Sequence, residues 1–364
     1  MTGRGRILVA SVHPSGRTPN QRFRFEQYVG YLRDNGFEIT FSPVVHPDEY
    51  DLIYSPGRMA RKASIVARGL LRRFADLARS GRYDIVFVPR EAVQLGTALF
   101  ERLVPRRGPK LVFDFDDAIW LPNASEANRG LAWLKRPEKT QEIIAASALV
   151  FAGNDFLADY ARQFNPAVEV VPTTIDTEQY QPRPSRPTQD AICVGWSGSL
   201  TTIVHFDLAI PVLRRLKDRF GDRVYFKLIG YPGYRADELG LVGVRWDPAT
   251  EVADLSEFDV GIMPLPDDEW SRGKCGLKGL QYMALEIPTV MSPVGVNPTI
   301  IDDGANGYLA STEDEWVERL SQLVESAELR ARLGAAGRET VVRDYSVDSQ
   351  KGRYLEYLTR ISSE

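Results

Sequence analysis

The chain contains 364 residues, of which 43% are hydrophobic and 26% are charged, and its 45 basic and 49 acidic side chains give a formal net charge of −4. This length predicts about two domains, and the composition excludes a disordered or collagen-like chain and disfavours a nucleic-acid enzyme. Cys193 and Cys275 have no CxxC or Cys/His spacing, which indicates neither a disulfide framework nor a zinc site. Because the N-terminal apolar run is too short for a signal sequence or a membrane span, we expect a soluble cytoplasmic protein.

Short apolar runs alternate with amphipathic segments through residues 1–180. The runs that read as buried parallel strands are Ile7–Val12, Ile85–Pro89, Leu111–Phe115, Leu149–Ala152 and Val168–Val171. Helical periodicity predicts helices over Arg24–Asn35 and Ile65–Leu77, and the second helix would bury Ile65, Leu70, Phe74 and Leu77 on one face. This alternation predicts an α/β domain with a parallel sheet.

The same rhythm restarts after Gln181–Gln189, which has three prolines in nine residues and is predicted to be a hinge linker. Strands are predicted at Ala191–Trp196, Tyr225–Ile229, Val242–Trp246, Val260–Pro264 and Thr289–Ser292, and helices at Phe206–Phe220 and Gly276–Leu285. Residues 190–345 are therefore expected to form a second doubly wound α/β domain. The chain ends in predicted helices at Glu313–Ser326, Glu328–Asp344 and Val347–Ile361.

The loop after the first strand is the first candidate site. Ligands of open α/β sheets bind at the carboxyl ends of the strands. This loop carries the small or polar residues Ser15, Gly16, Arg17 and Asn20, which suit a phosphate, a carboxylate or a sugar. An ordinary surface loop with solvated arginines explains it equally well. The loop lacks the GxGxxG pattern, which disfavours a nicotinamide dinucleotide.

A cluster of carboxylates follows the predicted strand Leu111–Phe115. Asp114, Asp116 and Asp117 stand within four positions, where each close pair repels by about 1 kcal/mol even in a watery setting. Such a cluster could bind a divalent metal, accept hydrogen bonds from sugar hydroxyls or act as a base. The alternative is a helix cap with a solvated surface.

Two segments of the second domain have the chemistry of an anion site. Gly198, Ser199 and Thr201 offer amides and hydroxyls directly after the first strand of this domain, without the lysine of a Walker loop. Further on, Arg272, Lys274 and Lys278 surround the start of the helix predicted near Gly276. Helix N-terminal amides with neighbouring cations suit a diphosphate. The competing interpretation pairs these cations with the acidic segment 267–269.

Several ordered segments resemble the retaining glycosyltransferases of family 4, which have the GT-B fold. In the second domain they read GWSGSLTT, FDVGIMPLPDDEW, KCGLKGLQYMALEIPTVMSPVG and DDGANGYLA; in the first they read FRFEQYVGYLRDNGFEI, DFDDAIW and GNDFLADYARQF. The resemblance implies two Rossmann-like domains facing across a cleft. Residues 1–180 would bind the acceptor and 190–345 the nucleotide-sugar donor, joined by the 181–189 linker, and the C-terminal helix at 346–364 would cross back to the first domain.

The resemblance also implies an activity and a set of site residues. The chain would transfer a sugar from a UDP- or GDP-linked donor to a hydroxyl acceptor, with retention and without a bound metal ion. The implied donor-binding residues are Gly198, Ser199, Thr201, Arg272, Lys274, Gly276, Leu277, Lys278 and Gln281. The implied acceptor-binding residues are Ser15, Gly16, Arg17, Asn20, Arg90 and Glu91, and the implied catalytic residues are Asp114, Asp116, Asp117 and Lys274.

The sequence departs from this family at three places, one of which is a strand end of the first domain where Asp114, Asp116 and Asp117 stand in place of the family's frequent histidine. The family's two glutamates, spaced E-x7-E, are replaced by Gly273 and Gln281, and the Arg…Lys pair that usually grips the diphosphate is replaced by the segment 197–202. Lys274 and Lys278 are expected to supply that charge. The alternatives are a non-catalytic nucleotide-sugar or glycan-binding protein, and a sugar-nucleotide epimerase or phosphorylase of the same fold.

Basic residues concentrate between Gly57 and Arg82. They are Arg58, Arg61, Lys62, Arg68, Arg72, Arg73, Arg79 and Arg82, against Asp76 as the one acidic residue. A solvated surface helix explains this stretch. Contact of residues 57–82 with an anionic membrane surface is the alternative.

Overall fold

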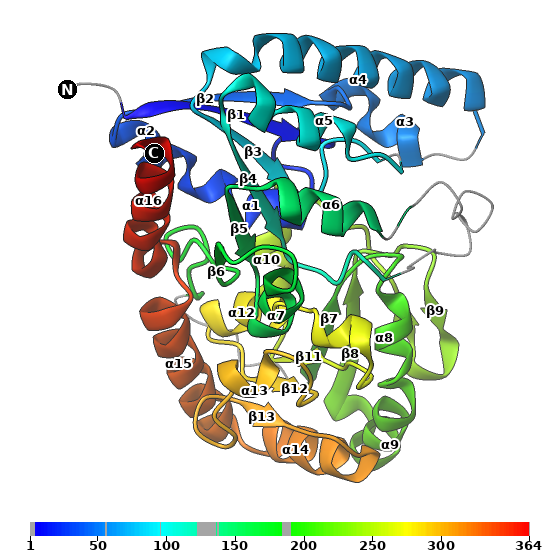
Figure 1. Ribbon diagram of the computed structural model, residues 1–364. Coiled ribbons are helices and arrows are strands. Elements are labelled where there is room, and N and C mark those ends of the chain that lie inside the picture. The colour runs from blue at the N-terminus through cyan, green and yellow to red at the C-terminus, as the bar shows by residue number, and fades with distance from the viewer. Residues whose placement is uncertain are drawn as a thin grey trace. The chain divides into compact units, whose positions relative to one another are not determined.

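The computed structural model describes residues 4–54, 57–94, 96–121, 136, 138–183 and 191–363. The chain divides into a first compact unit, Met1–Thr173 with Lys351–Glu364, and a second, Thr174–Gln350. Residues 174–180, which were predicted to be part of the first domain, therefore belong to the second unit. Most of the predicted linker, from residue 184 on, lies outside the described residues. Figure 1 shows the strands of each unit surrounded by helices.

The first unit is built on a parallel sheet with strand order β2-β1-β3-β4-β5-β6. These strands are β1 (Gly5–Ser11), β2 (Phe37–Pro43), β3 (Ile85–Pro89), β4 (Lys110–Phe115), β5 (Leu149–Ala152) and β6 (Val168–Val170). Its helices are α1 (Pro19–Arg22), α2 (Val29–Asp34), α3 (Tyr50–Tyr54), α4 (Met59–Arg79), α5 (Leu99–Leu103), α6 (Glu138–Ala146) and α7 (Asp155–Arg162). The predicted α/β class is confirmed.

Two local predictions for the first unit were wrong. The helix predicted over Arg24–Asn35 is instead a 3-10 turn, Glu26–Tyr28, followed by the short α2. The side chain of Arg24 is fully buried in the unit, so this residue does not belong to a surface helix. Strand β2 was missed because it is the edge strand of the sheet, with exposed and buried positions mixed along it.

The second unit has a parallel sheet with strand order β13-β12-β11-β7-β8. These strands are β7 (Ile192–Ser197), β8 (Val224–Ile229), β11 (Val260–Met263), β12 (Thr289–Met291) and β13 (Tyr308–Leu309). The helices are α8 (Ile203–Asp207), α9 (Ile210–Phe220), α10 (Glu251–Leu255), α11 (Glu269–Arg272), α12 (Leu277–Ala284), α13 (Asn297–Ile300), α14 (Glu313–Glu325) and α15 (Ala327–Asp344). Strand β7 lies between β11 and β8, so its carboxyl end is flanked by those of two parallel neighbours.

The strand predicted at Val242–Trp246 is only partly present. Leu241–Val242 is a strand, β10, that pairs antiparallel with β9 (Arg235–Ala236), and Val244 forms an isolated parallel bridge with Ile229 of β8. A Cβ atom at Gly243 would lie 2.0 Å from the carbonyl oxygen of Tyr231, so the chain passes too close there for any larger residue. The helix predicted over Phe206–Phe220 is divided into α8 and α9, since Pro211 stands in the first turn of α9.

The C-terminal helix α16 (Val347–Ser363) begins in the second unit and ends in the first, as expected. Within the first unit, the ring of Tyr354 stacks on Tyr28 with centroids 4.3 Å apart, and Arg360 pairs with Glu169 at 3.1 Å. At its other end, the amide of Val347 donates to the carbonyl of Ile175. The helix therefore contributes core contacts to the first unit.

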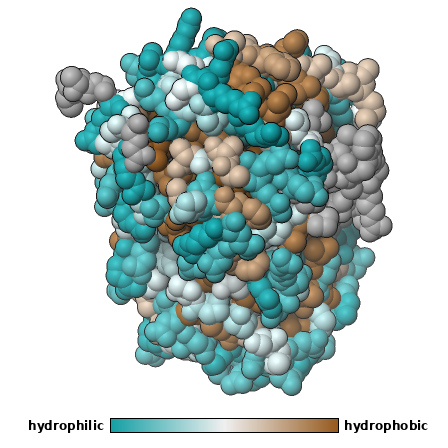
Figure 2. All heavy atoms as spheres, viewed as in Figure 1, coloured by the Kyte–Doolittle hydropathy of each residue, from teal (hydrophilic) through white to brown (hydrophobic). Residues whose placement is uncertain are grey.

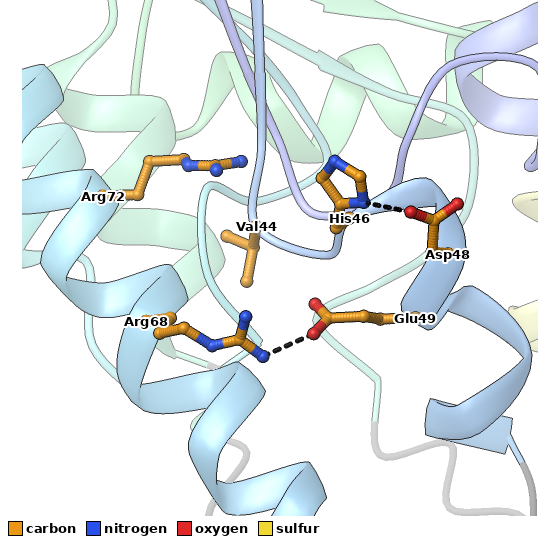
Figure 3. A pocket seen from close by; sticks show the side chains of 6 residues that line it. All are labelled: Val44, His46, Asp48, Glu49, Arg68 and Arg72. Carbon is orange, nitrogen blue, oxygen red and sulfur yellow. Dashed lines mark hydrogen bonds and ion pairs between the residues drawn. The ribbon is translucent and has the colours of Figure 1, made fainter.

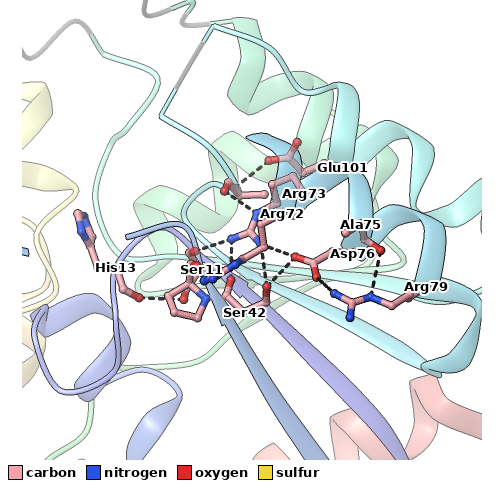
Figure 4. Close-up of polar contacts among 11 residues, drawn as sticks. Ser11, His13, Ser42, Arg72, Arg73, Ala75, Asp76, Arg79 and Glu101 are labelled. Carbon is pink, nitrogen blue, oxygen red and sulfur yellow. Dashed lines mark hydrogen bonds and ion pairs between the residues drawn. The ribbon is translucent and has the colours of Figure 1, made fainter. Parts of the chain in front are cut away.

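Helix α4 is held by a buried arginine. The guanidinium of Arg73 donates to Asp76 at 2.6 Å, to the carbonyls of Ser11 and Ser42 at 2.5 and 2.7 Å, and to the carbonyl of Ala92 at 2.9 Å. Figure 4 shows Ser11, Ser42 and Asp76 around Arg73. Because a buried charge is tolerated only with such partners, this network fixes which side of α4 faces the sheet.

The apolar face predicted for α4 was wrong at Phe74, whereas Ile65 is buried and Leu70 and Leu77 are partly buried, as predicted. Phe74 is 61% exposed, whereas the buried residues of the helix are Ile65, Gly69, Arg73 and Asp76. Gly69 permits close packing, since a Cβ atom there would lie 2.2 Å from Cγ1 of Val44. The inward side of this helix is thus partly ionic, and large apolar residues are left outside.

Candidate functional site

The carboxyl end of β7 is the first wall of the candidate site in the second unit. The loop that follows is closed by its own polar groups: the amide of Ser199 donates to Oγ1 of Thr202 at 3.0 Å, and the hydroxyls of Ser199 and Thr201 lie 2.9 Å apart. Gly198 is required, because a Cβ atom there would lie 2.0 Å from the ring of Trp196. Ser199 and Thr201 remain exposed at the loop tip.

The N-terminus of α12 forms the second wall. Gly276 is the N-cap residue with a φ of 70°, a left-handed conformation that favours glycine, and it supplies no side-chain cap. The amide of Leu280 is bonded to the carbonyl of Gly276, so the preceding amides, of Leu277, Lys278 and Gly279, point out of the first turn. These amides and the helix dipole favour an anion.

Two contacts bring the β7 end and α12 together. Nζ of Lys278 lies 5.5 Å from the centroid of the buried Trp196 ring. The amide of Ser197 donates to Oη of Tyr282, one turn further along α12, at 2.8 Å. The two segments, which were both predicted to bind the donor, therefore lie side by side.

The second lysine lies just before the helix. Nζ of Lys274 is 4.8 Å from the ring centroid of Trp270, and the side chain is partly buried. An indole ring attracts a cation electrostatically and restricts its position. Lys274, two residues before the N-cap residue Gly276, and Lys278, in the first turn of α12, thus add positive charge near the N-terminal amides of this helix.

The arginine of this segment is engaged elsewhere. Nε of Arg272 donates to Asp267 at 2.8 Å, and both side chains are exposed. Asp268 caps α11 by accepting from the amide of Ser271 at 2.7 Å. Arg272 thus pairs with the acidic segment 267–269, as in the alternative to diphosphate binding.

Gln281, predicted to bind the donor, is part of a buried cluster. Its Nε2 donates to Oη of Tyr180 at 2.9 Å and to Oε1 of Glu251 at 3.3 Å. Glu251 also accepts from Tyr180 at 2.7 Å and from Nε1 of Trp246 at 2.8 Å. The exposed fraction of Gln281 is 4% and that of Glu251 is 7%. Sequence reasoning missed this cluster because Tyr180, Trp246 and Glu251 come from distant segments with no local signal.

The Gln281→Glu substitution is expected to lower the free energy of unfolding by about 1–3 kcal/mol at neutral pH, because it replaces a donor with a second buried carboxylate beside Glu251. The loss should shrink on acidification as one carboxyl of the pair is protonated. Urea unfolding of the variant and of the control Gln322→Glu, at a partly exposed position of α14, measures the difference. Equal stability of Gln281→Glu and wild type at neutral pH would contradict the buried pairing.

In the first unit, the carboxylates after β4 are divided between two arginines. Asp114, with its side chain 1% exposed, accepts from Nη2 of Arg24 at 2.5 Å, and Nη1 of Arg24 donates to the carbonyl of Val171. Asp116 pairs with Nε of Arg90 at 2.7 Å, and Asp117 pairs with Nη2 of the same arginine. The burial of Asp114 gives it a structural role, and Asp116 and Asp117 are the more accessible carboxylates.

Arg90 and Glu91 occupy a bend after β3. Arg90 has a φ of 63°, which is uncommon for a residue with a side chain, and its amide donates to the carbonyl of Asp114. Glu91 pairs with Nζ of Lys139 at 2.8 Å. Arg90 and the Asp cluster are thus one ionic network at the carboxyl ends of β3 and β4. In the described part of the chain, no group of three or more His, Cys, Asp or Glu side chains is arranged to hold a metal ion.

The loop after β1 is organised by Glu26, which sequence reasoning missed. Its carboxylate accepts from the amide of Gly16 at 2.8 Å and from Nε2 of Gln21 at 3.1 Å. The guanidinium carbon of Arg17 lies 5.5 Å from the ring centroid of Tyr50. Ser15 is exposed, whereas Asn20 is 9% exposed in α1. The loop is therefore held by specific partners.

His13 stands at the start of this loop. Burial, with a contribution from the positive charge of Arg90, lowers the pKa of His13 from 6.5 to about 4. The imidazole is therefore neutral at physiological pH, and the unfolded chain binds a proton at His13 that the folded chain does not bind until about pH 4.

Stability from His13 is accordingly expected to be lost as the pH falls from 6.5 toward 4. Between pH 6.5 and 4, the free energy of unfolding should fall by about 2 kcal/mol less in the His13→Asn variant than in the wild type. A difference in stability that is the same at every pH does not affect this comparison. Urea unfolding across the pH range measures both curves. Parallel curves for the two proteins would show that His13 titrates normally in the folded state.

Part of the sequence is similar to known glycosyltransferases. Residues 191–326, which contain both walls of the candidate site, match the family described as Glycosyl transferases group 1. The D-inositol 3-phosphate glycosyltransferase of Stackebrandtia nassauensis is 27% identical over 241 residues, which cover 57% of this chain and 52% of that protein. The match thus spans about half the length of this curated relative.

Solved structures share the whole fold. Sucrose-phosphate synthase from Thermosynechococcus elongatus superposes with a TM-score of 0.68 at 15% identity, over 98% of this chain and 99% of that chain. The Anabaena protein HepE, solved in complex with UDP and glucose, gives a TM-score of 0.68 at 13% identity, over 98% and 100% of the two chains. The two Rossmann-like units therefore form the predicted GT-B fold.

Proposed function

We propose that this protein, which has the GT-B fold and whose residues 191–326 match the group 1 glycosyltransferases, is a glycosyltransferase that uses a nucleotide-diphosphate sugar. The donor is UDP- or GDP-linked and the acceptor is a hydroxyl group. We further propose that transfer retains the anomeric configuration, needs no metal ion and serves glycan or glycoconjugate synthesis in the cytoplasm.

One observation carries this proposal. The N-terminal turn of α12 and the ammonium group of Lys278 lie beside the carboxyl end of β7, and Lys274 precedes the same turn with its ammonium group over the ring of Trp270. A diphosphate matches such a site, because its oxygens can accept from several amides while two cations compensate its charge. The match of the same segment to the group 1 family supports the donor assignment.

The chemistry follows from that placement. When the bond between the sugar and the diphosphate breaks, negative charge develops on the leaving phosphate. Lys274, Lys278 and the first amides of α12 would stabilise this charge, with Ser199 or Thr201 as further donors. Electrostatic stabilisation of this kind usually contributes more to an enzyme's rate enhancement than any other single effect. Because the groups are already ordered, little reorganisation is needed during the reaction.

The acceptor side is proposed for the first unit. The acceptor hydroxyl must lose its proton as it attacks the sugar, and Asp116 and Asp117 are partly exposed carboxylates held by Arg90. Ser15, Gly16, Arg17 and Asn20, on the loop after β1, and Glu91, beside Arg90, complete the proposed acceptor set.

The Asp117→Asn substitution is expected to lower kcat about 10²-fold, because an amide cannot take up the acceptor proton, while the donor KM changes little. Steady-state kinetics with the donor concentration varied separate the two effects. The Glu269→Gln variant, which changes an acidic residue of α11 in the other unit, is the matched control. Normal kcat in Asp117→Asn would place the acceptor site elsewhere.

The experiment that tests the proposal is a donor screen. The full chain is incubated with UDP- and GDP-sugars, and release of the nucleotide diphosphate is measured with and without sugar or polyol acceptors. We expect turnover of one donor, with slow hydrolysis even without acceptor. Binding without turnover would instead favour a nucleotide-sugar-binding protein, the alternative suggested by Gly273 and Gln281 in place of two glutamates, and no binding would reject both.

A further inference from the structure

Helix α4 carries large apolar side chains on its outward side. Met59 is 66% exposed, Leu71 is 68% exposed and Phe74 is 61% exposed, and Val66 is exposed at 38%. Ala63, Ala67 and Ala78 are exposed on the same helix. At 100° per residue, these positions form one stripe along the helix. We name the stripe of Met59, Ala63, Val66, Ala67, Leu71, Phe74 and Ala78 the outer face of α4.

The outer face cannot turn inward. The buried network of Arg73 and the close approach of Gly69 to Val44 fix the opposite side of the helix against the unit. Rotating α4 to cover Leu71 and Phe74 would expose that side and strip the guanidinium of Arg73 of its partners. The apolar stripe is thus a permanent surface feature of the folded unit.

Basic side chains border this stripe. Arg61, Arg68, Arg72 and Arg79 are exposed on the adjoining side of α4, and Lys62 lies partly exposed across the stripe. Some have internal partners: Arg68 pairs with Glu49 at 2.5 Å, and Arg72 donates to the carbonyl of Pro43 at 2.5 Å. Figure 2 shows hydrophobic and hydrophilic spheres side by side over α4, at the top of the view. An amphipathic helix with arginines beside exposed Leu and Phe matches an anionic lipid surface.

A cavity lies beside α4, but its lining does not make it a binding site for an anion. It has a volume of about 350 Å³ and is lined by Val44, His46, Asp48, Glu49, Arg68 and Arg72, as Figure 3 shows. Asp48 and Glu49 place two carboxylates among its cations, so the cavity does not select an anion. We therefore consider the outer face, rather than this cavity, as the binding surface.

We propose that the outer face of α4 docks on an anionic lipid surface. The helix lies parallel to the surface, with Met59, Leu71 and Phe74 at the boundary of headgroups and acyl chains and the arginines at the phosphates. No helix in the described part of the chain is long and apolar enough to cross a membrane, so the contact is peripheral. A second copy of this chain is a poorer occupant, since a symmetric contact would bring arginines of both copies together. The proposal goes beyond the proposed function and does not rest on it.

Vesicle sedimentation of the full chain tests this proposal. We expect binding to vesicles of phosphatidylcholine mixed with phosphatidylglycerol, much weaker binding to phosphatidylcholine alone, and a strong decrease at high salt. The Arg61→Gln variant should bind about fivefold more weakly at low salt, because one cation near an anionic surface contributes about that factor. Equal binding to both vesicle types, or to neither, would overturn the proposal.

Variants of the outer face distinguish lipid docking from non-specific hydrophobic association. Leu71→Asp and Phe74→Asp should each reduce vesicle binding about tenfold or more, while Val342→Asp, at a 46% exposed valine of α15, should not. Thermal unfolding checks that each variant is folded, since all three side chains are exposed. Light scattering of the protein without vesicles provides a second readout. A dimer that Phe74→Asp converts to a monomer, without vesicle binding in wild type, would assign the face to a second copy and overturn the lipid proposal.

Discussion

Replacing Lys274 by alanine is expected to lower kcat/KM for the nucleotide sugar about 10²-fold, through both a higher donor KM and a lower kcat. The reason is that its ammonium group, held over the ring of Trp270, compensates charge that grows on the diphosphate as the sugar leaves. Lys278→Ala should have a similar effect, because this ammonium lies over Trp196 beside the first turn of α12.

Steady-state kinetics with the donor concentration varied measure both changes. The matched control is Lys227→Ala on β8, where the lysine pairs with Glu257 at 2.6 Å and takes no part in the proposed site. A Lys274→Arg variant keeps the charge and should recover a large part of the activity. Full activity of both Lys274→Ala and Lys278→Ala would remove the basis for placing the diphosphate at α12.

The Asp114→Asn substitution is expected to lower the free energy of unfolding by about 3–5 kcal/mol, the largest stability effect we foresee. It removes the carboxylate that accepts from the guanidinium of Arg24, whose side chain is fully buried. A loss of this size is a large part of the net stability of a typical domain.

Urea unfolding measures this loss, and two further variants test its cause. Asp116→Asn removes a partner of the partly exposed Arg90 and should cost only about 1 kcal/mol. Removing both charges together, as Arg24→Met with Asp114→Leu, should recover much of the stability lost in Asp114→Asn. If Asp114→Asn unfolds with wild-type free energy, the Arg24–Asp114 contact contributes nothing and the assigned structural role is wrong.

The fold was predictable because its signals are local. Runs such as Ile85–Pro89 are apolar on both faces, as expected of buried parallel strands, and they lie in the sheets where predicted. The edge strand β2 carries a weaker signal, since only part of each face is buried. On α4, periodicity alone assigned Phe74 to the core, because it could not show that Arg73 would take the buried position through partners on other segments.

The candidate site was predictable only in part, for the same reason. Glycines and cations near a strand end or a helix start are visible in the sequence, and Lys274, Lys278 and Gly276 were identified that way. Ion pairs and hydrogen bonds between distant segments could not be predicted from the sequence. Nothing near Asp114 in the chain points to Arg24, and nothing near Gln281 points to Glu251.

The central claim is that a nucleotide diphosphate binds at the start of α12, and a crystal structure of the full chain with UDP or GDP tests it most directly. We predict diphosphate oxygens within hydrogen-bond distance of the amides of Leu277–Gly279 and close to Nζ of Lys274 or Lys278. A nucleotide bound with its diphosphate away from these groups, or bound only in the first unit, would contradict this claim.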